Sequence, residues 1–498
     1  MSETRILDTV EVRTGAGTVR GAWRPIPGAD GSRSAAFLGI PFAQPPTGRR
    51  RFAAPVPVEP WEGVRGALEY GATAQRWVPP EPTLIPEPSV PGKSTLNVNV
   101  FTPRPDSDAK LPVLVWIHGG GYVSGSPASP WYDGIAFNRD GIVTVSISYR
   151  LGFDGFGWIE GAPANRGVLD WIAALEWVRD EISAFGGDPS DVTIAGQSAG
   201  GGAVLTLLGL PEAQELFHRA ISISGAVADI PVARAREAAG RLAAMLEVEP
   251  DRDGFASVPE KQIERRQVAA TRDPDARGLG ALRAALDATV PYGPVVDGEL
   301  LTRPTLESIA AGVGADKALV IGATDDEFSM ITDAYRGKLR FVPSWVAMGL
   351  LGIPRRTRRG YLADNRAVHG TASVTGRYVT DHVFRRLVAA VADARRTSAT
   401  WVYRFSWRSP TRGIALHCLD VPFFFDCLQA ERVDALAGDD PPQPLADAVH
   451  GAAVSFLRGG DPGWRAWSDA RGTTRVFGAP PGAREVDPDG YASVRALL

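Results

Sequence analysis

The stretch Val192-Thr-Ile-Ala-Gly-Gln-Ser-Ala-Gly-Gly-Gly202 predicts the fold of the whole chain. Residues suited to a buried strand run into a glycine-flanked serine, and an apolar, helix-like pattern follows from Ala203 to Leu208. We therefore predict a strand, a sharp turn and a helix, with Ser198 at the turn. In such a G-x-S-x-G turn the serine backbone is strained and its neighbours must be small, so that the hydroxyl is exposed at the tip of the sheet. Alone the motif is a weak signal, because a serine in any glycine-rich loop satisfies it.

The chain around this stretch has the pattern of an α/β protein. Leu111 to His118 and Ile142 to Ser148 are apolar runs without polar alternation, as strands buried on both faces require. Further strand-like and helix-like segments alternate along the chain: strands at 220–224, 318–322 and 401–405, and helices at 168–185 and 232–246. We predict a mainly parallel central sheet flanked by helices, preceded by a small antiparallel meander within residues 10–38. No repeat or low-complexity linker divides residues 1–498, so we expect a single domain.

Composition limits the function. Hydrophobic residues make up 44% and charged residues 22%, which is typical of a globular protein. The net charge is −4 and no basic block is present, so nucleic acid is not expected as a partner. No secretion signal or run of membrane-spanning length occurs, which predicts a cytoplasmic protein with no membrane partner. Two cysteines, six scattered histidines and no nucleotide-binding motif predict neither disulfide, metal nor cofactor. The oligomeric state is not determined by the sequence, and a monomer is compatible with it.

A second glycine-rich motif stands upstream of the serine. His118-Gly119-Gly120-Gly121-Tyr122 follows directly on the predicted strand at 111–117. A loop of this HGGG type can bring backbone N–H groups to a negatively charged oxygen. The two motifs, each at the end of its own strand, predict a nucleophilic serine and an oxyanion site.

These two motifs, and further segments that follow the same order along the chain, resemble the motifs of the type-B carboxylesterases. This α/β-hydrolase family includes the bacterial p-nitrobenzyl esterases and the cholinesterases. Further matching segments are Phe37-Leu-Gly-Ile-Pro-Phe-Ala-Gln-Pro-Pro, Leu96-Asn-Val-Asn-Val-Phe-Thr-Pro, Asn165-Arg-Gly-Val-Leu-Asp and Pro294-Val-Val-Asp-Gly. The resemblance implies an α/β-hydrolase fold with helical insertions and a serine carboxylesterase without cofactor.

The other two members of a catalytic triad are expected downstream. In these folds the acid follows the serine and precedes the histidine. Gly322-Ala-Thr-Asp-Asp-Glu-Phe-Ser offers Asp325, Asp326 and Glu327, and only the resemblance to the acid segment of the family favours Glu327. Six histidines are candidates for the base. His118 belongs to the glycine-rich loop, His218 follows the serine too soon, and the polar or helical surroundings set aside His369, His382 and His450, so that His417 remains. It begins a segment, His417-Cys-Leu-Asp-Val-Pro-Phe-Phe-Phe, that resembles the family's histidine loop.

The resemblance also implies supporting roles. The backbone N–H groups of Gly120, Gly121 and Ala199 correspond to the family's oxyanion trio. Ser224 matches a serine that hydrogen-bonds the acid in relatives, although a serine at a strand end explains its presence nearly as well. Gln197 stands where the family usually has glutamate, which counts against cationic, choline-like esters.

Two other features give less information about the chemistry. Trp171 stands where a glutamine is common in the family, and the sequence does not say what this changes. Cys418 and Cys427 flank the apolar segment after His417. We predict free, catalytically silent thiols, on the ground that neighbouring side chains in an extended segment point apart.

The predicted reaction is hydrolysis of small to medium neutral esters, aryl or short-acyl esters first, through a Ser-His-Glu triad and an acyl-enzyme. An amidase or carbamate hydrolase with the same triad is the first alternative. A non-catalytic binding module is the second, since some members of the family have lost the triad. The natural substrate is not readable, because we expect its pocket to be lined by insertions such as residues 77–91 and 340–377, which carry no recognisable chemistry.

Overall fold

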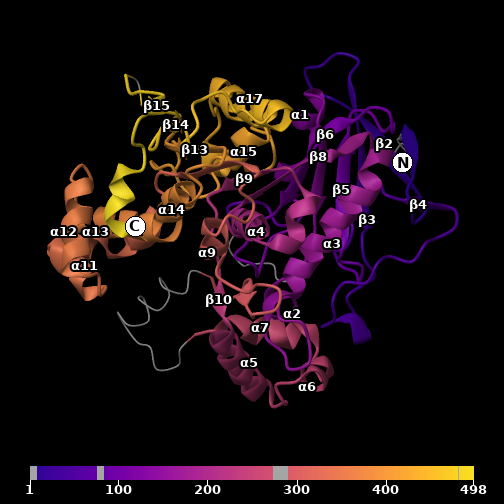
Figure 1. The fold of residues 1–498 in the computed structure, drawn as a ribbon, viewed down its shortest axis with the longest axis horizontal. Helices are drawn as coiled ribbons and strands as arrows, with labels where there is room; N and C mark the ends of the chain where they lie inside the picture. The colour runs from indigo at the N-terminus through magenta and orange to yellow at the C-terminus, as the bar shows by residue number, and fades with distance from the viewer. Residues whose placement is uncertain (1–7, 76–82, 273–289, 481) are drawn as a thin grey trace.

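The computed structural model describes residues 8–75, 83–272, 290–480 and 482–498. These residues form one sheet of 13 strands, with the N-terminal strands at one edge and the C-terminal strands at the other (Figure 1). In spatial order, its path runs through β1 (Thr9–Arg13), β2 (Thr18–Pro25), β3 (Arg33–Pro41), β5 (Asn97–Thr102), β7 (Val143–Ile147), β6 (Leu111–Ile117), β8 (Gly187–Gln197), β9 (Arg219–Ile223), β12 (Ala318–Thr324), β13 (Thr400–Phe405), β14 (Thr474–Phe477) and β15 (Val486–Asp487), while β4 (Val64–Gly66) pairs with β2. A second, two-stranded sheet joins β10 (Ile230–Pro231) to β11 (Val295–Val296).

Strand direction follows the sequence pattern. The six strands from β7 to β13 pair in parallel through β6, β8, β9 and β12, and β14 continues this parallel part. Strands β1, β2 and β3 pair antiparallel, as the predicted meander requires, and β3 continues it into the main sheet by pairing antiparallel with β5. The central strands are the uninterrupted apolar runs because both of their faces are covered by other parts of the protein.

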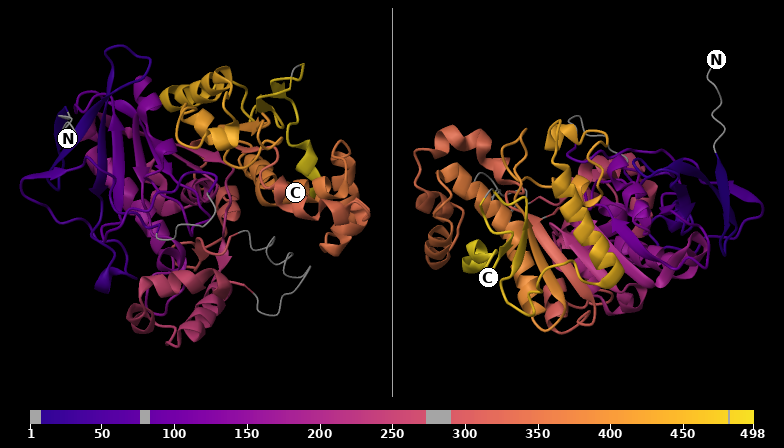
Figure 2. Two further views of the ribbon diagram at one scale, coloured as in Figure 1. Left: turned by 180° about the vertical axis from the view of Figure 1, so that it is seen from behind. Right: turned by 90° about the horizontal axis from the view of Figure 1, so that it is seen from above.

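Helices cover both faces of the sheet (Figure 2). They are α1 (Ile135–Arg139), α2 (Gly152–Phe156), α3 (Arg166–Glu181), α4 (Ala199–Leu208), α5 (Val232–Leu246), α6 (Arg252–Ser257), α7 (Glu260–Ala270), α9 (Thr305–Ala310), α10 (Arg336–Leu339), α11 (Ser344–Leu350), α12 (Arg355–Asp364), α13 (Thr371–Thr380), α14 (Arg386–Ala394), α15 (Val421–Phe424), α16 (Asp434–Ala437) and α17 (Gln443–Gly459). This arrangement confirms the predicted α/β-hydrolase class.

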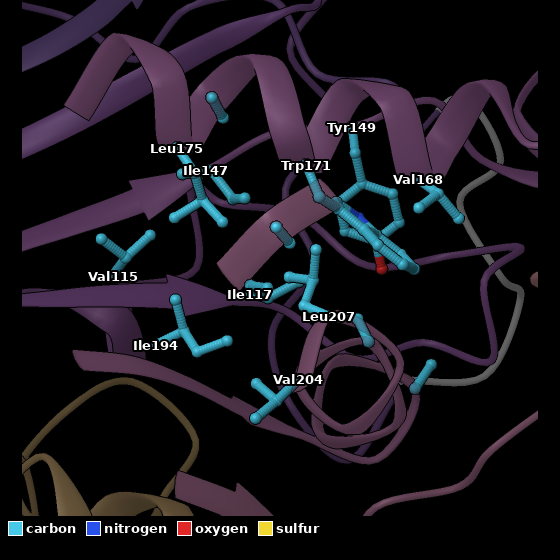
Figure 3. Close-up of a cluster of buried hydrophobic side chains, with 14 of the residues drawn as sticks. Val115, Ile117, Ile147, Tyr149, Val168, Trp171, Leu175, Ile194, Val204 and Leu207 are labelled. Carbon is cyan, nitrogen blue, oxygen red and sulfur yellow. The ribbon is translucent and has the colours of Figure 1, made fainter. Parts of the chain in front are cut away.

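Successive side chains of β6 point to opposite faces of the sheet and contribute to two apolar clusters, one on each face. Val115 and Ile117 belong to the larger apolar cluster, whereas Leu114 and Trp116 belong to a second cluster on the opposite face with α15 and α17. Figure 3 shows the first face, where strand side chains meet Trp171 and its neighbours on α3 and the apolar side chains of α4. Burying apolar residues on both faces fixes β6 and β8, whose ends carry the two glycine-rich motifs.

The predicted helix over 168–185 is α3 continued by a 3-10 turn, Ile182–Phe185. It ends at Gly186, whose φ of 85° lies in the left-handed region that favours glycine. The insertion at 340–377 forms α11, α12 and most of α13. Of the predicted proline-rich loop at 77–91, residues 77–82 lie outside the described residues, and 83–91 contain no helix or strand.

Candidate active site

Ser198 stands between β8 and α4, where the strand, turn and helix predicted from the sequence are all present. Its backbone has φ 60° and ψ −124°, a strained conformation for a residue other than glycine. The two flanking glycines have no room for a side chain. A Cβ on Gly196 would lie 2.5 Å from the carbonyl carbon of Gly200, and a Cβ on Gly200 would lie 2.0 Å from the oxygen of Ile117. Both glycines are therefore required by close backbone packing.

The HGGG loop lies against this turn. A Cβ on Gly119 would lie 3.1 Å from the Cβ of Ser198, so the loop and the serine are in contact. Gly120 and Gly121 have φ values of 108° and 60°, which favour glycine. Within the described part of the chain, no hydrogen bond from the N–H of Gly120, Gly121 or Ala199 to another protein atom is found. These donors are free to bind an oxygen of a substrate.

His118 is a buried residue of the loop and is hydrogen-bonded within it. Burial lowers its pKa to about 4, so the imidazole is neutral at physiological pH. Its Nδ1 donates to the carbonyl of Gly119 at 2.9 Å, and its ring stacks on Tyr149. The hydroxyl of Tyr149 donates to the carbonyl of His118 at 2.9 Å. The loop is thus fixed from both sides by buried groups.

Glu327 and His417 form a buried hydrogen-bonded pair. Nδ1 of His417 donates to Oε2 of Glu327, while Oε1 of the same carboxylate accepts from the N–H of Thr324 at 2.8 Å. The backbone N–H of His417 also donates to the carbonyl of Glu327 at 3.0 Å. These contacts join two loops that lie 90 residues apart in the chain. They fix both the position and the orientation of the imidazole ring.

The two neighbouring carboxylates, those of Asp325 and Asp326, bind arginines and not His417. Asp325 binds the guanidinium of Arg404 through both oxygens, at 2.8 Å each. Burial raises the pKa of Asp325, but the nearby arginines outweigh this effect and hold it well below its usual range. Asp326 pairs with Arg377 at 2.9 Å. Of the three acids left open by spacing alone, the structure brings Glu327 to His417.

Gln197 contacts His417 directly. Its side-chain nitrogen lies 3.1 Å from Nε2 of His417, and both residues are buried. Because an amide N–H can only donate, this contact favours the neutral tautomer in which Nε2 is an acceptor and Nδ1 carries the proton. The contact also places His417 beside the residue that precedes Ser198.

The charge state of His417 is set by opposing effects. Burial lowers its pKa, whereas the charge of Glu327 and its hydrogen bond raise it, and the resulting pKa lies above the ordinary histidine value. Burial raises the pKa of Cys418, which is therefore a neutral thiol at neutral pH. The carboxylate of Glu327 is the anion that favours the imidazolium.

We predicted that Cys418 takes no part in catalysis because an extended segment would point its side chain away from His417. That geometric reason is wrong. Cys418 has φ 69°, so the segment is not extended there, and its thiol interacts with the neighbouring imidazole of His417. Both Cys418 and Cys427 are free, as predicted. Their catalytic silence stays a prediction.

Three groups near the Glu327–His417 pair were not identified from the sequence. The rings of Phe328 and Phe384 pack on the imidazole of His417, with centroids 4.6 Å and 5.0 Å away. Asp420 is buried, accepts from the hydroxyl of Tyr403 at 3.2 Å, and has a pKa raised to about 7 by burial and by the nearby charge of Glu327. Adjacency to Glu327 was a signal for Phe328, whereas nothing in the sequence places Phe384 at the site.

Ser224 has other surroundings than the resemblance implies, and Trp171 packs against a residue that contacts the HGGG loop. The backbone N–H of Ser224 donates to the carbonyl of Gly322 at 2.8 Å, but among the described residues its buried hydroxyl has no hydrogen-bond partner. The structure therefore does not contain the hydrogen bond to the acid that the resemblance implied. Trp171 is fully buried and packs edge-on against Tyr149, at a centroid distance of 5.5 Å. Its ring supports a residue that itself holds the HGGG loop.

The described residues contain neither a cluster suited to a metal ion nor a helix suited to cross a membrane. Nowhere in the described ranges do three or more histidine, cysteine or acidic side chains gather in a way that could hold a metal ion. In the same ranges, every helix is too short or too polar to cross a bilayer.

Comparison with known proteins gives consistent matches along the chain. Residues 8–475 match the model of the carboxylesterase family. A para-nitrobenzyl esterase of Bacillus subtilis (strain 168) is 34% identical over 453 residues, covering 86% of each chain. A phenmedipham hydrolase of Pseudarthrobacter oxydans is 32% identical over 451 residues, also 86% of each chain.

Solved structures give the same result. A carboxylesterase of Geobacillus stearothermophilus, solved at pH 6.2, superimposes with a TM-score of 0.81 at 31% identity, covering 98% of this chain and 99% of that one. A structure of PNB esterase superimposes with a TM-score of 0.78 at 29% identity, with the same coverage. The strained serine turn, the glycine-rich loop beside it and these matches agree: the chain belongs to the carboxylesterase family and is a carboxylic ester hydrolase.

Proposed function

We propose that the protein hydrolyses small to medium neutral carboxylic esters through a triad of Ser198, His417 and Glu327 and a covalent acyl-enzyme. The observation that carries this proposal is the buried Glu327–His417 pair, whose imidazole contacts Gln197, the residue next to the strained and partly exposed Ser198. A base oriented by a buried carboxylate next to a serine on such a turn is the arrangement that activates a hydroxyl for attack.

In the first half of the reaction, His417 Nε2 accepts the proton of Ser198 as the serine oxygen attacks the ester carbonyl. Glu327 keeps the other ring nitrogen protonated and stabilises the imidazolium that forms. Because the amide of Gln197 occupies Nε2 in the resting site, it must release this nitrogen when the proton transfers. His417 then protonates the departing alcohol, and the acyl group stays on Ser198.

In the second half, a water molecule takes the place of the alcohol and repeats the same proton transfers. The N–H groups of Gly120, Gly121 and Ala199 receive the negatively charged oxygen of each tetrahedral intermediate. The loss of one such donor typically costs about 3–4 kcal/mol of transition-state stabilisation. The close contact between Gly119 and Ser198 supports this role, because it holds the loop next to the reacting carbonyl.

Active-site labelling tests the nucleophile. We expect a fluorophosphonate probe to label the wild-type protein and not Ser198→Ala, which should also lose ester turnover by roughly 10⁶-fold in kcat. Ser190→Ala is a matched control, because Ser190 is exposed and is hydrogen-bonded only to its neighbour Asp188 among the described residues. Substantial turnover by purified Ser198→Ala, or labelling that survives the substitution, would refute the triad.

A substrate panel separates the proposed range from its alternatives. The panel contains matched ester and amide pairs, a carbamate and phenmedipham, because one relative carries the name phenmedipham hydrolase. Amide hydrolysis demands stronger protonation of the leaving group than ester hydrolysis does. We expect neutral aryl and short-acyl esters to give the highest kcat/KM. A higher value for an amide or carbamate would assign the chain to the alternative activity, and absence of any turnover would indicate a binding module.

A further inference from the structure

The segment at residues 329–366 exposes an unusual amount of apolar surface. Six of the large hydrophobic side chains that the described part of the chain exposes lie within 20 residues of one another: Ile331, Tyr335, Phe341, Trp345, Val346 and Leu350. Phe341 is 75% exposed, and three others of the six are more than half exposed. Scattered apolar residues are normal on a protein surface, but such a local concentration marks an interaction site.

Helix α11 shows that this exposure is not a failure of packing. Its residues Ala347 and Met348 are buried, whereas Trp345, Val346 and Leu350 point outward. The buried side belongs to a small core of its own, which includes Met348, Leu351, Tyr361 and Tyr378. An ordered core on one side thus presents an apolar face on the other.

The same segment is strongly basic. Residues 329–366 contain eight lysines and arginines and two aspartates, which gives +6 in a chain whose net charge is −4. Two of the arginines lie directly on the exposed rings: Arg340 is 4.4 Å from the ring centre of Phe341, and Arg358 is 4.3 Å from that of Trp345. On α12, Arg355, Arg356 and Arg359 are exposed to solvent. Arg340 and Arg358 thus share a surface with the exposed rings, and the exposed arginines of α12 belong to the same helix as Arg358.

This surface lies at one end of the molecule. Helices α11, α12 and α13 form a lobe far from the N-terminal strands, seen in orange at the left of Figure 1 and again in both views of Figure 2. The lobe is fixed to the acid loop of the active site, because Arg377 pairs with Asp326 and Thr380 donates to the carbonyl of Asp326 at 2.9 Å. Whatever binds this surface is held at a set orientation to the catalytic domain.

The positive charge of this surface distinguishes two candidate binding partners, a second copy of the chain and an anionic bilayer. In a twofold dimer the same patch meets itself, so two surfaces of +6 would be placed against each other and would repel. An anionic bilayer satisfies both features, since its headgroups attract arginine and lysine while its acyl region accepts exposed aromatic and aliphatic side chains. The sequence predicts no membrane partner because it holds no spanning run, but a surface that lies on lipid needs none.

We propose that residues 331–359 form a docking surface for anionic lipid bilayers. Phe341, Trp345 and Leu350 enter the headgroup and acyl boundary, and the arginines of α12 contact the lipid phosphates. This inference does not depend on the proposed triad or on the identity of the ester substrate.

Vesicle co-sedimentation tests the proposal with the full-length protein. We expect binding to vesicles of phosphatidylcholine mixed with phosphatidylglycerol, weak binding to phosphatidylcholine alone, and loss of binding at high salt. Arg355→Gln combined with Arg356→Gln should lower the partition coefficient by about fivefold for each arginine. Phe341→Ser should lower it further.

Matched controls lie outside the segment. Arg303→Gln combined with Arg412→Gln removes the same charge from exposed positions, and Met245→Ser removes another exposed apolar side chain. These should bind as the wild type does. Absence of binding, equal binding to both kinds of vesicle, or equal losses in controls and test variants would overturn the proposal. Concentration-dependent self-association abolished by Phe341→Ser would assign the surface to a second copy of the chain instead.

Discussion

Replacing Gln197 by glutamate tests how the residue beside the nucleophile controls both proton transfer and substrate charge. In Gln197→Glu, a carboxylate oxygen takes the place of the amide nitrogen that lies 3.1 Å from His417 Nε2. The position is buried, at 1% exposure, so water screens the new charge only weakly. Unit charges at about 4 Å attract by about 4 kcal/mol at an effective dielectric constant of about 20. Since one pKa unit corresponds to about 1.4 kcal/mol, the pKa of His417 should rise by about 1–3 units.

The direction of the effect on activity follows from the proposed role of His417 as the catalytic base. Only the neutral imidazole accepts the serine proton, so activity falls as the pH drops through the pKa of His417. In the wild type this pKa is already above the ordinary value of 6.5, which puts the acidic limb of kcat/KM above that pH. Gln197→Glu should move the limb further upward and reduce turnover of a neutral ester at pH 7 by about 10-fold to 1000-fold.

A cationic alcohol responds in the opposite direction. The introduced carboxylate attracts an ammonium group a few ångströms away by about 1–4 kcal/mol, depending on solvent screening. The ratio of kcat/KM for a choline-type ester to that for its uncharged isostere should therefore rise by about tenfold or more. Measuring kcat/KM for both esters from about pH 5 to pH 9 separates the two effects. The acidic limb of the profile gives the pKa of His417, and the ratio of the two kcat/KM values gives the preference of the alcohol site.

Gln197→Met is the matched control. It removes the hydrogen bond that favours the neutral imidazole of His417 without adding charge, so the limb should move upward by less than in Gln197→Glu and the ratio should stay unchanged. If Gln197→Glu leaves the limb and the ratio unchanged, charge at this position does not control the site, and the shape of the pocket selects the alcohol.

Four further substitutions test other parts of the site. Glu327→Gln should reduce kcat by roughly 10⁴-fold and move the acidic limb to lower pH, because the imidazolium loses its anion; a limb at the wild-type position would argue against Glu327 as the partner. Gly200→Ala should abolish activity and lower the melting temperature, since its Cβ would meet the Ile117 oxygen at 2.0 Å. Gly240→Ala, in α5 with nothing within 4 Å of its Cβ, should instead stabilise the protein by up to about 1 kcal/mol in chemical unfolding. Cys418→Ser should retain ester turnover in the wild-type range, and a large loss would show that the thiol contributes to catalysis.

Much of the scaffold could be predicted because it depends on local properties of the chain. The uninterrupted apolar run at 111–117 marks β6, since a strand covered on both faces has no polar side. The two glycines around Ser198 mark the strained turn, since backbone atoms of the neighbouring elements leave no space for a Cβ. Both signals lie within a few residues, and each is fixed by sterics or burial at that place.

The parts that could not be read depend on contacts between distant segments. Spacing left three acids open, and only the folded chain shows that arginines hold Asp325 and Asp326 while Glu327 meets His417 across 90 residues. The positive φ of Cys418, which brings its thiol to the imidazole, has no local sequence signal because the residue is not glycine.

The sequence by itself determined that a strand precedes each of the two glycine-rich motifs, and it determined the serine turn and the glycine-rich loop, because backbone sterics and apolar periodicity act over a few neighbours. Tertiary structure alone decided which carboxylate serves His417, that Gln197 contacts its Nε2, and that Phe384 packs on its ring. It also decided which side of α11 is buried. The helix has apolar residues on both sides, so the sequence pattern does not indicate which side faces solvent. Such choices are made by which distant surfaces the sheet brings together, and no single stretch of sequence carries that information.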